Sequence, residues 1–412
     1  MFDKLTSIKT IITQVEELTK SQYDFLGYIL GMFLSIKTRI NFLQCARHSD
    51  AYTEKSCRLQ FERYVDFVAI NSAYIQQKGS GRYVIAYDLS YVRKSGKSTA
   101  GTGKYWSGAA QKALWGLEVG LLSVIDIGNH TAFHRRAAPL DAIQTPGRQE
   151  RQSKGIDLVD HYAQSILYAK ETLEKLSGYL AVDAYFAKKD FIDRIQSQSR
   201  LAVITRLRCD ANCNYLYRGP VRKGRGAPKK YDGKIDWKKP DSKHFKLSYQ
   251  DETVMIYDAQ VYCVFLKRNI RIAFCQFLAD DFRVSSYKIY ACTDLALPAL
   301  LIQQYYKARF QQEFLIRDAK QFTGLQDCQA RSVNKLEYHW NVALTAINIA
   351  KFEHWLDNPD QQQQPFSMAD IKTRYHNQLL MERFFQIFPD VAELAKNNPK
   401  IKELYAFGAI AA

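Results

Sequence analysis

The 412-residue sequence contains no long uninterrupted apolar run. Its most apolar early stretch, residues 25–36, is broken by glycines and followed by Lys37, so it is too short to span a bilayer and is expected to form a buried helix. The first twenty residues, MFDKLTSIKTIITQVEELTK, lack the charged-then-apolar order of a secretory signal. We therefore expect a cytoplasmic protein without a membrane partner.

Sequence motifs for zinc or nucleotide binding are also incomplete. The eight cysteines are scattered, and a reducing compartment gives no reason to expect structural disulfides. Cys209 and Cys213 lie four residues apart, but no second pair accompanies them at zinc spacing. Gly96-Lys97-Ser98 does not complete a P-loop, because the position that requires the first glycine is Tyr91. The sequence thus supports neither a zinc site nor the use of ATP.

Charge is the first positive signal. Lys and Arg outnumber Asp and Glu by 58 to 42, which gives a formal net charge of +16. Hydrophobic residues make up 47% and charged residues 24%, as in an ordinary globular protein. A polyanionic partner is therefore expected, although charge alone does not separate DNA from RNA or from an anionic membrane surface.

The N-terminal region, residues 1–75, is predicted to be helical. Apolar residues recur at helical spacing in 23–43 and again in 59–70. A polar turn precedes Thr53, which can cap a helix that bears three cations, Lys55, Arg58 and Arg63. This arrangement resembles a helix-turn-helix, and a plain helical bundle is the alternative.

From about residue 80 the pattern changes to that of strands. Two apolar runs, 84–89 and 178–183, are typical of buried strands and carry Asp88 and Asp183. Further strands are predicted at 117–127, 131–139 and 201–206, and helices at 156–176 and 188–196. Three strands, a helix, a strand, a helix and a strand is the order of a ribonuclease-H-like domain.

The next element expected in such a domain is a helix that carries the last acidic residue, and in this sequence it follows only after a β-rich segment. This helix is predicted to run from 297 to 320, and a helix at 334–355 and a polar linker at 361–365 follow it. We therefore predict an α/β protein with a ribonuclease-H-like catalytic core, a β-rich insertion and flanking helical regions. Its segments are a helical DNA-binding region (1–75), the first part of the core (76–208), the β-rich insertion (209–290), the last part of the core with the glutamate helix (291–355) and a C-terminal helical region (356–412).

Three acidic residues in these elements form a candidate catalytic metal site: Asp88, Asp183 and Glu313. Mg²⁺ and Mn²⁺ prefer carboxylate and water oxygens, and two such ions can activate a nucleophile and stabilise the leaving oxygen of a phosphodiester. A strand-end aspartate alone is weak support, because such residues often cap turns. Three other aspartates compete for the role: Asp126, Asp190 and Asp294.

The segment YYKARFQQEFLIRDAK, residues 305–320, is more specific. At about 100 degrees per residue, a tyrosine, two cations and an acid fall within roughly 60 degrees of one helix face. These residues are Tyr306, Arg309, Glu313 and Lys320. A solvated helix face with an Arg–Glu pair would give the same pattern.

This Tyr-Arg-Glu-Lys spacing resembles the signature of bacterial insertion-sequence transposases of the insertion-sequence-four type. Three flanking segments are similar to the acidic regions of that family: YDLSYVRKSGKSTAGTGKYWSG, LAVDAYFAKKDFI and CTDLALPALLIQQYYKARFQQEF. The resemblance covers roughly residues 20–410. It implies that two Mg²⁺ or Mn²⁺ ions bind Asp88, Asp183 and Glu313. It also implies that DNA near the cleavage point is held by Tyr306, Arg309 and Lys320.

The resemblance further implies cut-and-paste DNA transposition at the bacterial nucleoid. Transposon ends would be hydrolysed, through hairpinned ends, and the exposed 3′-hydroxyl would attack target DNA. The two ends must be cut together, so a homodimer is expected. Two alternatives are a nuclease on the same core without strand transfer and a domesticated DNA-binding regulator.

Two basic groups are further candidates for DNA contact. One follows Asp88, with a solvated loop as its alternative: Arg93, Lys94, Lys97 and Lys104. The other lies in the insertion: Arg222, Lys223, Arg225, Lys229 and Lys230. An aromatic residue of the insertion could stack where a terminal base is flipped out, and the sequence does not choose among Trp237, Tyr287 and Tyr290.

The basic composition predicts that binding to nonspecific duplex DNA weakens steeply with salt, because Lys and Arg displace condensed counterions. Neutralising Arg222, Lys223 and Arg225 together should reduce the slope of log affinity against log salt by about 2 to 3. The slope is measured by titration at several salt concentrations. A flat dependence in the wild-type protein would contradict the prediction.

Overall fold

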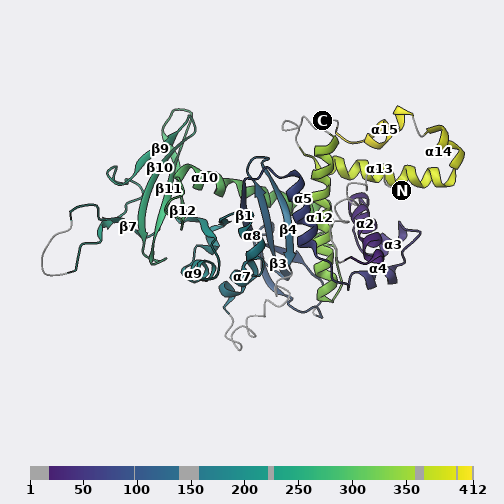
Figure 1. The fold of residues 1–412 in the computed structure, drawn as a ribbon, viewed down its shortest axis with the longest axis horizontal. Coiled ribbons are helices and arrows are strands. Elements are labelled where there is room, and N and C mark those ends of the chain that lie inside the picture. The colour runs from purple at the N-terminus through teal and green to yellow at the C-terminus, as the bar shows by residue number, and fades with distance from the viewer. Residues whose placement is uncertain are drawn as a thin grey trace.

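The computed structural model describes residues 18–96, 98–138, 157–220, 227–357, 366–395 and 398–410. The molecule is elongated (Figure 1). A β-rich end with β7 and β9–β12 leads into a central region where β1, β3 and β4 lie beside helices, and α2–α5 and α12–α15 form the other end. The predicted mixed α/β class is confirmed.

One twelve-stranded sheet runs through the β-rich end and the centre. Its central strands are, in spatial order, β4 (Thr131–Ala138), β3 (Lys112–Asp126), β1 (Tyr83–Arg93), β5 (Tyr179–Val182) and β6 (Ala202–Leu207). The first three pair antiparallel, whereas β1, β5 and β6 are parallel to one another. An additional strand that the sequence analysis did not predict, β2 (Gly103–Ser107), also pairs with β3.

The remaining strands continue the same sheet. They are β7 (Cys213–Leu216), β8 (Tyr231–Lys234), β9 (Lys246–Gln250), β10 (Val254–Cys263), β11 (Arg268–Leu278) and β12 (Val284–Cys292). β12 pairs antiparallel with β6, with Tyr290 opposite Arg206. The β-rich segment is therefore an extension of the central sheet, joined to it edge to edge.

Alternating residues of the central strands pack into two hydrophobic cores. In β1, Val84 and Ala86 belong to one core, whereas Ile85 and Tyr87 belong to the other. This follows from the two-residue period of a strand whose faces are both covered. The first core includes Leu315 of the helix region after the insertion.

Helices cover both faces of the centre. The second core contains side chains of α7 (Leu158–Leu167), α8 (Lys170–Glu174) and α9 (Lys189–Gln198). The first contains side chains of α10 (Ala299–Ala308), α11 (Phe310–Gln321) and α12 (Val333–Asp357). The single helix predicted for 156–176 is wrong, because the chain turns at Tyr168 and Ala169 between α7 and α8.

The N-terminal helices are α2 (Lys20–Ser35), α3 (Phe42–Arg47), α4 (Glu54–Gln60) and α5 (Phe67–Lys78). The predicted helical stretches 23–43 and 59–70 are each interrupted. The first ends where Ile36 adopts an extended conformation, and the second is broken between α4 and α5. α2 packs against α12 and α13 and is largely buried, so its role in this structure is to build the core.

The C-terminal region contains α13 (Met368–Ile387), α14 (Pro389–Ala395) and α15 (Pro399–Ala406). The predicted linker at 361–365 lies outside the described residues. In the described part of the chain, every helix is too short or too polar to cross a lipid bilayer.

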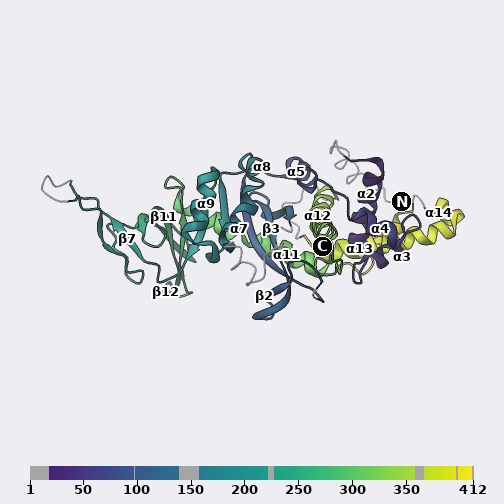
Figure 2. The same ribbon diagram turned by 90° about the horizontal axis from the view of Figure 1, so that it is seen from below.

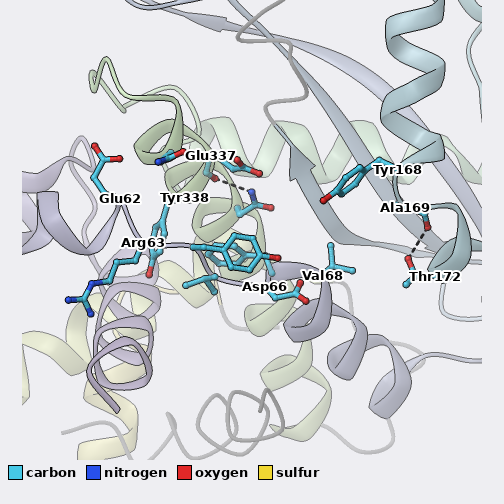
Figure 3. Close-up of a pocket in the computed structure, with 14 residues that line it drawn as sticks. Glu62, Arg63, Asp66, Val68, Tyr168, Ala169, Thr172, Glu337 and Tyr338 are labelled. Carbon is cyan, nitrogen blue, oxygen red and sulfur yellow. Dashed lines mark hydrogen bonds between the residues drawn. The ribbon is translucent and has the colours of Figure 1, made fainter. Parts of the chain in front are cut away.

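A cavity of about 350 Å³ lies where the segment between α4 and α5 meets the start of α12 (Figure 3). Its polar lining is largely engaged in local structure: Glu62 accepts hydrogen bonds from Ser332 (2.8 Å) and Lys335 (2.9 Å), and Asp66 caps α5 through the Ala69 amide (3.0 Å). The three candidate acids are not among its lining residues. The cavity is also lined by Tyr168, Ala169 and Thr172, so it lies between the helical end and the central region, and it is separate from the site described next.

Candidate active site

Two of the candidate acids are neighbours in the central sheet, beside the carboxyl end of β5. The expectation that Asp88 closes its strand is wrong, because β1 continues to Arg93 and pairs with β3 over its whole length. In the parallel pair of β1 and β5, Ala86 is opposite Ala181 and Tyr87 is opposite Val182. Asp88 and Asp183 are the next residues along each strand, and neighbouring strands are about 4.8 Å apart. Both aspartates share the strand face of Ala86 and Ala181, which pack into the core that α11 covers.

The backbone around each aspartate holds its carboxylate in place. Asp88 Oδ1 accepts a hydrogen bond from the Leu89 amide (2.8 Å). Asp183 Oδ1 accepts one from the Tyr185 amide (2.7 Å), which caps the short 3₁₀ helix η1 (Ala184–Phe186). Thr205 donates its hydroxyl to the Asp183 carbonyl (2.9 Å), so β6 also fixes the end of β5.

The third candidate acid, Glu313, is linked to Asp88 by the side chain of Arg309. Arg309 Nη2 lies 2.9 Å from Glu313 Oε1, and Arg309 Nη1 lies 3.3 Å from Asp88 Oδ2. The guanidinium is largely buried, with 9% of the residue exposed. Arg309 therefore joins an acid of the sheet to an acid of the helix.

The prediction of one helix over 297–320 is wrong at this residue. Arg309 forms the junction between α10 and α11, and the Gln312 amide bonds to its carbonyl at 2.9 Å in a tightened turn. The backbone of Arg309 stays in the helical region, so Tyr306 and Glu313 remain on neighbouring parts of one ridge. Arg309 Cζ lies 5.6 Å from the Tyr306 ring centroid.

Gln312 is a positioning residue that the sequence analysis missed. Its side chain is fully buried, and Nε2 donates to the Leu121 carbonyl (2.8 Å) and the Ser123 hydroxyl (3.1 Å) of β3. These bonds hold α11 against the sheet one residue before Glu313. The only sequence signal is an amide next to the glutamate, which is too common to identify such a role.

The three acids influence one another electrostatically. The pKa of Asp88 is raised from 3.8 to about 6, chiefly by burial and to a smaller extent by Asp183 and Glu313, whereas Arg309 and the Leu89 amide oppose the increase. Burial disfavours the charge on Arg309, but Asp88 and the other neighbouring acids outweigh it and raise the pKa of the guanidinium. Neighbouring carboxylates of this kind are suited to a shared cation.

The donor set fits a hard divalent ion, because its oxygens come from carboxylates. Among the described residues, however, no group of three His, Cys, Asp or Glu side chains is arranged closely enough to enclose a metal ion as it stands. The Arg309 guanidinium lies between Asp88 and Glu313 and pairs with both. A metal bound by all three acids requires that this ion pair open.

The other residues of the predicted ridge lie around this centre. The Tyr306 ring stacks at 35° against Tyr290 of β12, with 4.7 Å between centroids. Burial lowers the pKa of Lys320, and Asp88 counteracts this effect. Burial raises the pKa of Tyr290 and of Tyr306, and Arg206, an exposed cation on β6 that the sequence analysis missed, opposes both increases.

The candidate basic residues have different environments. Lys94 is buried and donates to the carbonyls of Cys328 (3.2 Å) and Ala330 (2.5 Å), so the predicted DNA contact is wrong and its role is structural. Arg93 and Lys104 are exposed, as are Lys229 and Lys230. Four candidates lie outside the described residues: Lys97, Arg222, Lys223 and Arg225.

The structure also distinguishes the three aromatic residues that were candidates for stacking where a base is flipped out. Trp237 is buried and donates its indole N–H to the Ala211 carbonyl (2.7 Å), and Tyr290 is covered by Tyr306. Tyr287 is half-buried and borders a cavity together with Trp237. The structure therefore leaves Tyr287 as the most accessible of the three.

Of the three competing aspartates, Asp126 and Asp294 accept local hydrogen bonds, and Asp190 is exposed. Asp126 is fully buried and accepts from the amides of Ser80 (2.7 Å) and Asn129 (2.9 Å), which organises the turn after β3. Asp294 accepts from the Ala296 amide (2.8 Å) and the Tyr179 hydroxyl (3.0 Å). Asp190 is exposed in the first turn of α9. These roles favour Asp88 and Asp183 as the acids that β1 and the end of β5 contribute to the site.

Sequence comparison now identifies the family. A profile described as transposase DDE domain matches residues 79–349, which is more than half of the chain. The chain belongs to the transposase DDE domain family. No curated protein matches it in sequence. The matched region contains Asp88, Asp183 and Glu313 together with their elements.

Family membership confirms that this protein is a DDE transposase, an enzyme that acts on DNA. DDE transposases generally depend on divalent metal ions. The cluster of Asp88, Asp183 and Glu313 has the oxygen-donor chemistry that such an ion requires.

Asp88 should make the metal-free transposase less stable at neutral pH. Its folded pKa of about 6 lies above the ordinary 3.8, so the folded state binds more protons between these values and stability falls as pH rises through about 4 to 6. Asp88→Asn should raise the free energy of unfolding by about 1–3 kcal/mol at pH 7 and leave it nearly unchanged at pH 3.5.

The measurement is urea unfolding in chelator at both pH values. Asp190→Asn is the control, because Asp190 is an exposed aspartate at a helix start. Equal or lower stability of Asp88→Asn at pH 7 would contradict the electrostatic account of the site.

Proposed function

We propose that Asp88, Asp183 and Glu313 are the metal-binding catalytic triad of a cut-and-paste DNA transposase of the insertion-sequence-four type. The observation that carries the proposal is the proximity of Asp88 on β1 to Asp183 at the end of the adjacent β5, with Arg309 joining Asp88 to Glu313. The strand order β4-β3-β1-β5-β6 supports a ribonuclease-H-like core, because three antiparallel strands are followed by two parallel ones.

The triad would hold divalent ions, Mg²⁺ or Mn²⁺, through carboxylate oxygens. When bound, two such ions supply activation of the attacking oxygen and charge stabilisation of the leaving oxygen. Hydrolysis would join the oxygen of water to phosphorus and break the bond to the 3′ oxygen, which leaves as the 3′-hydroxyl. In strand transfer that hydroxyl would attack a phosphorus of target DNA and displace a target 3′ oxygen.

Arg309 provides a physical link between DNA and the acids. In the DNA-free protein its guanidinium neutralises Asp88 and Glu313. A phosphate offers two oxygens in the geometry that a guanidinium binds best. We infer that the DNA phosphate draws Arg309 away from the carboxylates, which frees their oxygens for metal.

Tyr306 and Lys320 would position the same DNA. Tyr306 can offer a hydroxyl donor or a ring face, although its packing on Tyr290 limits its movement. Lys320 is a partly buried cation near Asp88 and can contact a phosphate at the cleavage point. Exposed Arg93, Lys104, Lys229 and Lys230 would hold the DNA farther along its backbone.

The resemblance further supports a homodimer that cuts two ends together, and hairpinned ends as an intermediate. A nuclease on the same core would cleave without joining, and a domesticated regulator would bind without cleaving. Products joined to target DNA distinguish the transposase from both.

The triad assignment predicts that Asp88→Ala, Asp183→Ala and Glu313→Ala each abolish Mg²⁺- or Mn²⁺-dependent cleavage of transposon ends, while end binding in chelator changes by less than about threefold. Cleavage is measured on labelled end DNA, and Asp190→Ala serves as the matched acidic control. A normal cleavage rate in any of the three triad variants would remove that residue from the site.

The DNA-positioning role predicts that Arg309→Ala and Lys320→Ala slow cleavage of pre-nicked ends at least tenfold even at saturating metal. Lost phosphate contacts misplace the scissile bond, and excess metal cannot restore them. Cleavage rates are measured across a metal titration. Wild-type rates in both variants would exclude the role, and full rescue by metal would place these residues in the metal-binding shell instead.

A further inference from the structure

The hairpin of β2 and β3 carries an exposed aromatic surface that the transposase chemistry described above does not use. Figure 2 shows β2 projecting from the central region. Trp106 is 62% exposed and Trp115 is 40% exposed. Exposed tryptophans on a projecting strand pair are unusual in a soluble protein, because burial of an indole is strongly favourable.

Both indoles lie on the same face of the hairpin. Lys104 is directly opposite Trp115, and Trp106 is opposite Ala113. Directly opposite residues share a face, and so do residues two apart on one strand. The face formed by Lys104, Trp106, Ala113 and Trp115, the tryptophan face, is exposed at every one of these positions. The small side chain of Ala113 leaves the Trp106 ring uncovered.

Local hydrogen bonds fix this face. The Trp115 indole N–H donates to the Gly96 carbonyl (2.9 Å), and the Tyr91 hydroxyl donates to the Trp115 carbonyl (2.6 Å). Tyr105 on the opposite face donates its hydroxyl to the Gly101 carbonyl (2.9 Å). The hairpin is therefore a preorganised platform, which reduces the entropy lost when a ligand binds.

The charge of the surrounding segment indicates the kind of partner. From residue 89 to residue 117 the sequence contains no Asp or Glu and five cations: Arg93, Lys94, Lys97, Lys104 and Lys112. Of these, Arg93, Lys104 and Lys112 are exposed. Aromatic faces interleaved with cations are the features of surfaces that bind unpaired nucleic acid strands.

The platform extends from the strands that hold the first acid. Asp88 of β1 is opposite Leu121 of β3, and Trp115 lies six residues farther along β3. At about 3.3 Å per residue the tryptophan face begins roughly 20 Å from Asp88. A DNA strand engaged at the acids can therefore reach the face within several nucleotides.

We propose that the tryptophan face binds an unpaired DNA strand beside the cleavage point, with bases stacked on Trp106 and Trp115 and a phosphate paired with Lys104. An unpaired strand is the ligand of choice, because base faces are hidden inside an intact duplex and exposed in a single strand. The inference rests on the proposed function only in taking DNA as the partner.

The test measures binding of a fluorescent 12-nucleotide oligo(dT) to the full chain by anisotropy, in chelator, beside a duplex of equal length. Trp106→Ala and Trp115→Ala should each weaken oligo(dT) binding about tenfold and change duplex binding by less than threefold. Trp106→Phe should stay within threefold of wild type, whereas Trp106→Leu should lose as much as alanine. Phe407→Ala is the control, because Phe407 is a 79% exposed aromatic that directly follows α15.

Three outcomes would overturn the proposal: wild-type oligo(dT) binding by Trp106→Ala, equal binding by the leucine and phenylalanine variants, or an equal loss of duplex binding. A fall in the sedimentation mass of DNA-free Trp106→Ala with unchanged oligo(dT) affinity would instead make the face a contact between two copies of the chain. Because binding is measured without metal, failure here is distinguishable from failure of the triad, which appears as cleavage by the triad variants.

Discussion

The candidate site depends on an interaction that holds three carboxylates, those of Asp88, Asp183 and Glu313, near one another in a half-buried position. Asp88 lies midway along β1, Asp183 directly follows the parallel neighbour β5, and Glu313 approaches from α11. Their mutual repulsion would favour separation, and Arg309 offsets it by pairing with an acid on each element. Burial of the guanidinium strengthens these interactions, because less water screens them.

Residues next to this ion pair connect distant parts of the fold to the site. Gln312 holds α11 to β3, and stacking of Tyr306 on Tyr290 ties the same ridge to β12. β12 in turn pairs with β6, whose Thr205 supports Asp183. The β-rich extension is therefore mechanically continuous with the acids. In the proposed mechanism, DNA bound along that extension and DNA at the acids act on one rigid unit.

The sequence was sufficient to predict that buried strands carry Asp88 and Asp183, because strands buried on both faces give uninterrupted apolar runs. It did not predict that β1 continues beyond Asp88 to Arg93, because that part of the strand is no longer uniformly apolar. Family membership confirmed the expected transposase, while the insertion-sequence-four branch stays a proposal. The turn at Arg309 was missed because no Gly or Pro in residues 305–320 marks a break in the helix. Lys94 was misjudged because its partners, the carbonyls of Cys328 and Ala330, lie more than 200 residues away. The exposure of Trp106 likewise depends on tertiary structure that no local pattern reveals.

The central claim is that the three acids form one metal site when DNA releases Arg309. The most direct measurement is the anomalous scattering of Mn²⁺ in crystals of the transposase bound to end DNA. The account predicts manganese between the carboxylates of Asp88, Asp183 and Glu313, with the Arg309 guanidinium on a DNA phosphate. Manganese bound elsewhere, or Arg309 still paired with Asp88 and Glu313 beside a bound ion, would contradict it.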